Sequence, residues 1–192
     1  DDYRQGKKTY TLGLNDHADW TQDELNILRS GIQLPKDRII NGAPYYPYTG
    51  INSACVFRSV EGGRIQFESL RYTKIPANNT AAMQQALADY GPLWVSLFIG
   101  NQTTSTYKMI SSTFNNYKSG IFQVNGCPAS VSSSNHAVVI VGYGVDETTG
   151  VPYWKVRNSW EPRWGDGGYF KIQRGVNMCG IESGVFYLAR TA

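Results

Sequence analysis

The sequence has 192 residues, 41% of them hydrophobic, which is enough apolar material for one well-buried domain and an additional segment. Its formal net charge is only +3 and no run of lysine or arginine stands out, which argues against nucleic acid or an anionic membrane as the main partner. No apolar stretch approaches the roughly 20 residues that cross a bilayer as a helix.

The first 40 residues differ in character from the rest. Residues 6–14 predict an exposed strand, and residues 15–20 predict a turn. The capping box Thr21-Gln22-Asp23-Glu24 predicts a short helix that continues through Arg29. Ser30-Gly31 follows as the end of that helix.

The middle of the chain predicts a helix between strands. Residues 64–70 alternate as a half-buried strand. Asn79 or Thr80 caps a helix that Gly91-Pro92 ends. Its apolar face is expected in the core and comprises Met83, Leu87 and Tyr90. Next come a buried strand, a polar loop and a further strand, at residues 93–99, 103–120 and 121–124.

A β-hairpin carries the residues with the most specific chemistry. From His136, an almost unbroken β-branched run that ends in glycines predicts a buried strand. Residues 145–152 are polar and end in glycine and proline, as a hairpin loop should. The second strand alternates, and one of its faces holds Trp154, Val156, Asn158 and Trp160. Two closing strands follow, at residues 169–172 and 185–188.

Antiparallel pairing around that loop brings His136 opposite residues 158–160, to within about two residues of register. An imidazole acts as acid or base when its tautomer is fixed, and the carbonyl of Asn158 fixes it by accepting one ring N–H. The indole of Trp160 beside this contact would exclude water and strengthen it. The hairpin therefore predicts a histidine site, and the competing interpretation is a core histidine satisfied by a neighbouring amide.

Three motifs in order carry a resemblance: Asn135-His136-Ala137, then Tyr-Trp-x-Val-x-Asn-Ser-Trp at residues 153–160, then Trp-Gly-Asp-Gly-Gly-Tyr at residues 164–169. They resemble the papain/cathepsin L family of cysteine proteases. The resemblance implies an α+β fold in which an antiparallel β-barrel with a few short helices is joined to a helical half that bears the nucleophile. It also implies that His136 is the catalytic histidine, Asn158 its orienting asparagine and Trp160 their shield.

The resemblance divides the chain into three parts. Residues 1–40 are similar to the end of the family's inhibitory prosegment, residues 41–63 to a remnant of the helical half, and residues 64–192 to the β-barrel half. The positions that match the prosegment motif are Gly13, Asn15, His17 and Asp19. His17 replaces the family's phenylalanine, and we interpret it as a solvated turn residue without a catalytic role.

The three cysteines are assigned by the same resemblance. Cys127 and Cys179 match a family disulfide, and closing that loop would stabilise the fold by about 4 kcal/mol in the chain-entropy model. Cys55 matches a structural cysteine whose partner is absent here, so it is unpaired or bonded to another chain or segment. The family's Cys-Gly-Ser-Cys-Trp nucleophile motif and oxyanion-hole glutamine are also absent from the sequence.

Further expectations concern the pocket and the cell compartment. Ala137 and Gly184 match positions that line the family's pocket for the side chain two residues before the cut, which implies a bulky apolar side chain there. Glu182 is interpreted as a surface charge. Sequons at Asn78 and Asn101, together with the cysteine pair, favour a glycosylated protein that is lysosomal or secreted.

The resemblance implies a papain-like cysteine endopeptidase in zymogen form, which acts on extended peptides and takes its nucleophile from a segment outside this sequence. Two alternatives remain open: a non-catalytic protease-like binding or structural protein, and a prosegment-type protease inhibitor. Glu161-Pro162, where the family has glycine, modestly favours the first alternative, and the missing prosegment helices argue against the second. No metal or other cofactor is expected, because two histidines in unrelated contexts are too few for a ligand set.

Overall fold

The computed structural model describes residues 8–13, 39–40, 43–44 and 70–190. Its main feature is an eight-stranded sheet. The strands are β1 (Tyr10–Leu12), β4 (Leu70–Ile75), β5 (Leu93–Leu97), β6 (Tyr117–Phe122), β7 (His136–Val145), β8 (Pro152–Arg157), β9 (Tyr169–Gln173) and β10 (Val185–Arg190). Their spatial order is β1-β6-β9-β8-β7-β5-β10-β4. Of these neighbours only β6 and β9 are parallel.

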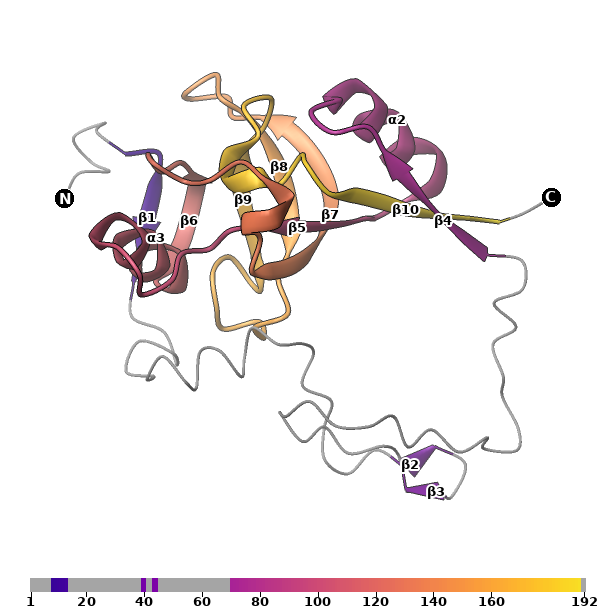
Figure 1. Ribbon diagram of the computed structural model, residues 1–192, viewed down its shortest axis with the longest axis horizontal. Helices are drawn as coiled ribbons and strands as arrows, with labels where there is room; N and C mark the ends of the chain where they lie inside the picture. Colours follow the sequence, from indigo (N-terminus) through magenta and orange to yellow (C-terminus); the bar gives the residue numbers. More distant parts are fainter. Residues whose placement is uncertain (1–7, 14–38, 41–42, 45–69, 191–192) are drawn as a thin grey trace.

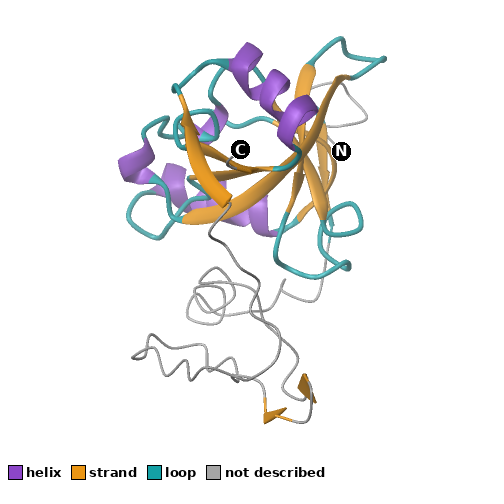
Figure 2. Ribbon diagram, turned by 90° about the vertical axis from the view of Figure 1, so that its right-hand side faces the viewer, coloured by secondary structure: helices purple, strands orange, loops and turns teal. Residues whose placement is uncertain are grey.

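In the described part of the chain, two helices accompany the sheet, α2 (Thr80–Tyr90) and α3 (Ser105–Asn115). Figure 1 shows α3 beside β6 at one end of the sheet and α2 beside β10 at the other. Figure 2 shows that the strands curve and cross one another rather than lie flat. Two 3₁₀ turns (Val131–Ser133 and Met178–Gly180) and a separate pair of short strands, β2 (Ile39–Ile40) and β3 (Ala43–Pro44), complete the described elements.

The predicted hairpin is confirmed, with β7 and β8 joined through residues 146–151. A β-bulge interrupts their register between Ile140 and Gly142, so that Val141 is an extra residue of β7. The strand is half-buried rather than buried, because side chains alternate across the sheet and Val141 and Val145 are 38% and 55% exposed. The same alternation in β5 leaves Trp94 49% exposed.

The prediction of a polar loop at residues 103–120 is wrong, because this stretch contains α3 and the start of β6. The hydroxyl of Thr104 caps the helix by accepting a hydrogen bond from the backbone N–H of Tyr107 at 3.1 Å. Only Ile110 and Phe114 are large apolar side chains on its buried face. Two such residues among serines and threonines give a weak helical pattern in the sequence.

The expectation for α2 holds except at its last residue. Asn79 caps the helix, its side-chain oxygen accepting from the N–H of Ala82 at 3.0 Å. Met83 is buried as expected, but Tyr90 is 52% exposed and stacks on Tyr187 with ring centroids 4.5 Å apart. Ala86, 5% exposed, packs in the core instead. The ring of Tyr90 therefore lies at the surface of the protein and not in its core.

The strand near the N-terminus is shorter than the predicted residues 6–14 and is not wholly exposed. Tyr10 of β1 is 6% exposed, and its ring lies 5.7 Å from that of Phe122 in β6. The close approach of β1 requires glycine at position 120, where φ is +86° and a Cβ atom would collide with the carbonyl oxygen of Thr9. The eight-stranded sheet thus includes residues 10–12, far along the chain from its other strands.

Several sequence expectations lie outside the described residues. They are the helix at residues 21–29, residues 64–69 of the strand predicted before β4, and Asn15, His17, Asp19 and Cys55. In the part of the chain that the structure describes, no helix is long and apolar enough to cross a membrane.

The side chain of Tyr117 connects β6 to β9 through hydrogen bonds. Its side chain is 1% exposed, and its hydroxyl donates to the carbonyl of Gly120 at 2.6 Å and accepts from the N–H of Lys171 at 3.2 Å. Burial is the main cause that raises the pKa of Tyr117 to about 12, while the hydrogen bond from Lys171 opposes it.

We expect the protein to lose stability as the pH rises from 10 to about 12, because the pKa of Tyr117 falls back to 10.0 on unfolding. The folded state favours the neutral phenol. The stability that Tyr117 contributes is therefore complete below its pKa in the unfolded chain and is lost as the pH approaches its pKa in the folded protein. Urea unfolding across this range measures the effect. Tyr117→Phe should flatten the alkaline decline, and Tyr72→Phe, at a 76% exposed position, should leave it unchanged. An unaltered decline in Tyr117→Phe would assign it to other groups.

Candidate active site

The hairpin brings an imidazole and a carboxamide into contact. His136 is the first residue of β7, and Asn158 directly follows β8. Nε2 of His136 lies 2.9 Å from Oδ1 of Asn158, and the two residues are only 5% and 4% exposed. This geometry confirms the expectation from the sequence that His136 and Asn158 lie in contact.

The amide of Asn158 is oriented by the backbone. Its Oδ1 also accepts a hydrogen bond from the N–H of Ser159 at 2.8 Å, and the backbone N–H of Asn158 donates to the carbonyl of Gly168 at 3.0 Å. An amide oxygen only accepts hydrogen bonds, so the ring nitrogen that faces it must carry the proton. Neutral His136 is therefore the Nε2–H tautomer, and Nδ1 is its basic nitrogen.

Aromatic rings surround this pair. Trp160 is fully buried, and its ring centroid lies 5.2 Å from that of His136. Phe114 of α3 approaches the imidazole edge-on at 6.2 Å and Trp160 at 5.3 Å. Water is kept from the contact, which strengthens a hydrogen bond. Phe114 is the site residue that sequence analysis missed, and its spacing of four from Ile110 is the signal that could have revealed it.

A groove of about 300 Å³ opens beside His136, lined also by Trp94, Ser96, Ser134, Asn135 and Ala137. Ala137 is exposed and pairs directly with Ser96 of β5. Gly184 is buried behind Ser96, where a Cβ atom would lie 3.0 Å from the serine hydroxyl and 3.2 Å from a methyl of Val131. Both residues that the resemblance assigns to a pocket therefore border Ser96.

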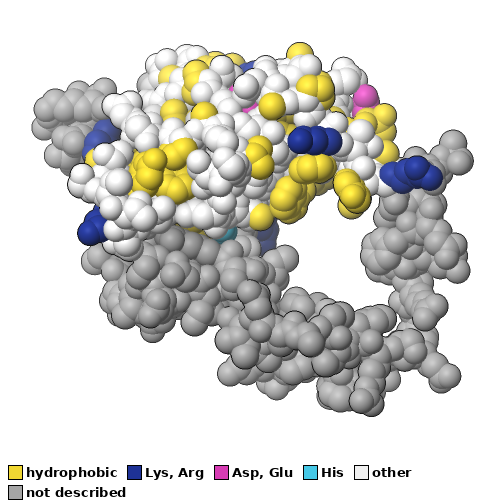
Figure 3. Space-filling view, viewed as in Figure 1, with side chains coloured by type: hydrophobic (Ala, Val, Ile, Leu, Met, Phe, Trp, Pro, Cys, Tyr) yellow, Lys and Arg dark blue, Asp and Glu magenta, His cyan; other side chains and the backbone are white. Residues whose placement is uncertain are grey.

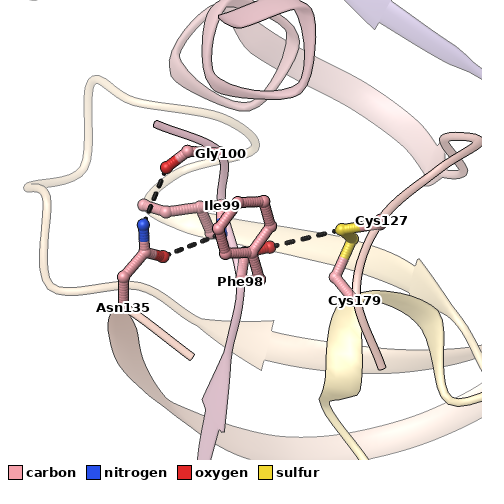
Figure 4. The surroundings of a disulfide bond; sticks show 6 residues. All are labelled: Phe98, Ile99, Gly100, Cys127, Asn135 and Cys179. Atoms are coloured by element: carbon pink, nitrogen blue, oxygen red, sulfur yellow. Dashed lines mark hydrogen bonds between the residues drawn. A yellow bond between two sulfur atoms is a disulfide. The ribbon is translucent and has the colours of Figure 1, made fainter. Parts of the chain in front are cut away.

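Figure 4 shows how the chain entering β7 is held. Asn135 accepts a hydrogen bond from the N–H of Ile99 at 3.0 Å and donates one to the carbonyl of Gly100 at 2.7 Å. On the other side the disulfide Cys127–Cys179, as the resemblance implies, lies against Phe98, whose N–H donates to the carbonyl of Cys179 at 2.8 Å. The segment that follows β5 is thus held between Asn135 and the disulfide.

The interpretation of Glu182 as a surface charge is wrong, because its side chain is 1% exposed. Oε1 accepts hydrogen bonds from the indole N–H of Trp154 at 2.8 Å and the N–H of Gly175 at 2.7 Å. Oε2 accepts from the N–H of Asn177 at 3.0 Å. Three converging N–H donors make burial of a carboxylate tolerable. Glu182 thereby connects the hairpin to the loop that leads to the disulfide.

The remaining candidates are dispersed. Asn78 is exposed, whereas the side-chain oxygen of Asn101 accepts hydrogen bonds from the N–H and hydroxyl of Thr103 at 2.9 and 2.6 Å. Gly13 donates its N–H to the carbonyl of Asn116 at 2.9 Å. Within the described residues, no three His, Cys, Asp or Glu side chains gather where they could hold a metal ion.

Comparisons with known proteins identify a family to which the chain is similar. The model of a family described as papain family cysteine protease matches residues 30–189. The sequence is 37% identical over 142 residues to the oryzain gamma chain of Oryza sativa subsp. japonica, and likewise to pro-cathepsin H of Mus musculus. Each match covers 74% of this chain but only 35% and 38% of the relative. The chain thus spans little more than a third of the length of these curated relatives.

Solved structures give a similar result. The bromelain protease from Ananas comosus in complex with the E64 inhibitor is similar over 62% of this chain and 49% of that chain, with 34% identity and a TM-score of 0.50. The digestive procathepsin L2 proteinase from the larval midgut of Tenebrio molitor is similar over 100% of this chain and 87% of that chain, with a TM-score of 0.69. Its identity is 22%, so this second likeness concerns the fold.

We expect neutral His136 to populate both tautomers in the Asn158→Leu variant, because the ring N–H loses its acceptor. Long-range ¹H–¹⁵N spectra of the full chain, at a pH where the ring is neutral, should show the Nε2–H form in the wild type and a mixture in the variant. Asn158→Asp retains an acceptor and should retain the tautomer. His17, the other histidine of the sequence, serves as the internal reference. An unchanged tautomer in Asn158→Leu would show that Asn158 does not fix it.

Glu182→Gln should lower the free energy of unfolding by about 2–3 kcal/mol, because the amide turns a donor toward N–H groups that need an acceptor. Urea denaturation measures the change. Glu147→Gln removes the same charge at an exposed loop position and should alter stability by less than about 0.5 kcal/mol. Equal effects of both substitutions would point to net charge instead of the buried network.

Proposed function

Because the chain belongs to the papain family of cysteine proteases, we propose that it supplies the β-barrel half of a cysteine endopeptidase. The observation that carries the proposal is the buried contact between Nε2 of His136 and Oδ1 of Asn158, covered by Trp160. It makes Nδ1 the basic nitrogen of the imidazole. The nucleophilic cysteine would come from a segment outside this sequence.

The chemistry follows from that tautomer. Nδ1 of His136 takes the proton of the cysteine thiol, and the thiolate attacks the carbonyl carbon of the substrate peptide bond. The imidazolium then returns this proton to the departing amine, leaving an acyl group on the sulfur. Water, deprotonated by the same nitrogen, hydrolyses the thioester and restores the thiol. Asn158 orients the ring throughout and Trp160 keeps water from their hydrogen bond.

The substrate would be an extended peptide in the groove beside His136. Ala137 lines this groove and Gly184 packs closely behind Ser96, another residue of its lining, and small residues at both positions support a preference for a bulky apolar side chain two residues before the cut. The partner that we propose for Cys55 is a cysteine of the nucleophile-bearing segment.

The domain organisation that accompanies this function has three parts. Residues 1–40 act as the end of an inhibitory prosegment, residues 41–63 belong to the helical half and residues 64–192 form the barrel half. The pairing of β1 with β6 supports the first assignment, because it attaches the N-terminal segment to the barrel through backbone hydrogen bonds. The protein would be glycosylated at Asn78 and Asn101 and be lysosomal or secreted.

Labelling with the epoxide inhibitor E64 tests the proposal. The protein is expressed from its whole gene, purified without reductant, treated with E64, and its peptides are analysed by mass spectrometry before and after reduction. We expect one adduct, on a cysteine outside these 192 residues, in a polypeptide that is disulfide-bonded to Cys55. His136→Ala should abolish the adduct because the thiol loses its base. The matched variant His17→Ala should be labelled like the wild type.

Two results would overturn the proposal. A protein whose mass equals this chain alone, with Cys55 free and no adduct, has no nucleophile and is a protease-like binding protein. Labelling that is the same in His136→Ala and wild type would remove His136 from the reaction.

A further inference from the structure

A second surface feature lies on the opposite face of the hairpin from the buried tryptophan Trp154. Three cationic side chains and two tyrosines project there from the central strands β8 and β9, and we call them the cationic–aromatic face. They are Tyr153, Lys155 and Arg157 of β8 and Tyr169 and Lys171 of β9. The candidate active site uses none of these residues.

Each cation is held against a tyrosine ring. The Lys155 ammonium and the Arg157 guanidinium lie 5.2 and 5.1 Å from the centroid of Tyr169, and Arg157 also donates a hydrogen bond to its hydroxyl at 3.0 Å. The Lys171 ammonium lies 4.7 Å from the centroid of Tyr153. These cation–π contacts restrict otherwise mobile side chains, so the positive charges have defined positions.

The charges are concentrated despite their mutual repulsion. Lys155 and Lys171 are direct partners across β8 and β9, an arrangement that is unfavourable for like charges. In the described part of the chain, no carboxylate forms an ion pair with Lys155, Arg157 or Lys171. The nearby carboxylate of Asp146 accepts hydrogen bonds from Thr149 and Thr148 of the hairpin loop, and these bonds lower its pKa, with a smaller contribution from the charge of Lys171. The face therefore carries an excess of positive charge, which Asp146 offsets only in part, at Lys171.

Neighbouring glycines make room for this arrangement. Gly142 and Gly144 of β7 pair with Lys155 and Tyr153. The ring of Tyr153 lies across Gly144, where a Cβ atom would approach its hydroxyl to 2.6 Å. A side chain at position 144 would displace the ring of Tyr153 and with it the ammonium group of Lys171, which lies over that ring.

We propose that the cationic–aromatic face binds a sulfated polysaccharide. Charge complementarity requires an anionic ligand, and strand geometry spaces the backbone positions that carry the cations by about 5 Å between strands and about 7 Å along a strand. A polymer with sulfate groups on successive sugars offers repeated anions at comparable spacing, and guanidinium and ammonium groups bind such oxyanions well. An acidic peptide fits less well, because β8 and β9 each have neighbours on both sides and offer no unpaired strand edge.

The test measures binding of a heparin octasaccharide to the full-length protein by isothermal titration calorimetry at physiological salt. Lys155→Gln/Lys171→Gln should weaken binding by about tenfold or more, because two of the three cations are removed. The matched control Lys74→Gln/Lys108→Gln removes two exposed lysines from β4 and α3 and should change the affinity by less than about threefold. Tyr169→Leu leaves the charge intact and should still weaken binding, because Lys155 and Arg157 lose their support.

Equal losses in the two double variants would overturn the proposal, since binding would then follow net charge. The absence of measurable octasaccharide binding to the wild type would do the same. Poly-glutamate or single-stranded DNA that binds as tightly as the octasaccharide would reassign the face to a peptide or a nucleic acid. Far-UV circular dichroism and the melting temperature of each variant verify that it is folded. None of these readouts depends on proteolysis.

Discussion

The hydrogen bond between His136 and Asn158 is the contact on which the rest of the site depends, and it exists because a hairpin fixes its register. Its two residues lie just where regular pairing ends, so small errors of register would separate them. The structure secures the register from several directions. Asn135 and the disulfide hold the segment that follows β5, and Phe114 and Trp160 fill the space around the imidazole.

The fold and the site are predictable from the sequence where the controlling interactions are local. A hairpin is specified by its loop and by alternation in its strands, so the meeting of His136 with Asn158 could be inferred from residues 136–160. The family resemblance and the fold could be recognised because the motifs are long and ordered, and the family match confirms them. The helix cap at Asn79 is also a local feature.

The sequence does not reveal the environment of a side chain whose contacts are distant along the chain. Glu182 is charged in a loop, and only the folded structure brings the indole of Trp154 and the turn at Gly175 around it. The strand β1 acquires its partner β6 more than a hundred residues away, at Tyr10 and Gly120. Helix α3 buries only two large apolar side chains, and one of them, Phe114, contacts five other rings, among them those of His136 and Trp160. Such assignments follow from tertiary contacts that local propensity does not encode.

Because of the bulge at Val141, the side chains of β7 on the core side of the sheet are even-numbered before the bulge and odd-numbered after it. Up to Ile140 the even-numbered residues face the core, which places His136 inside. Beyond the bulge Tyr143 shares the face of Trp154, and the even-numbered Gly142 and Gly144 face outward. A strand in strict alternation could satisfy only one of these requirements. Removing one residue at this point would therefore turn either the imidazole or the hairpin tip inside out, so the extra residue lets one strand serve two opposed surfaces.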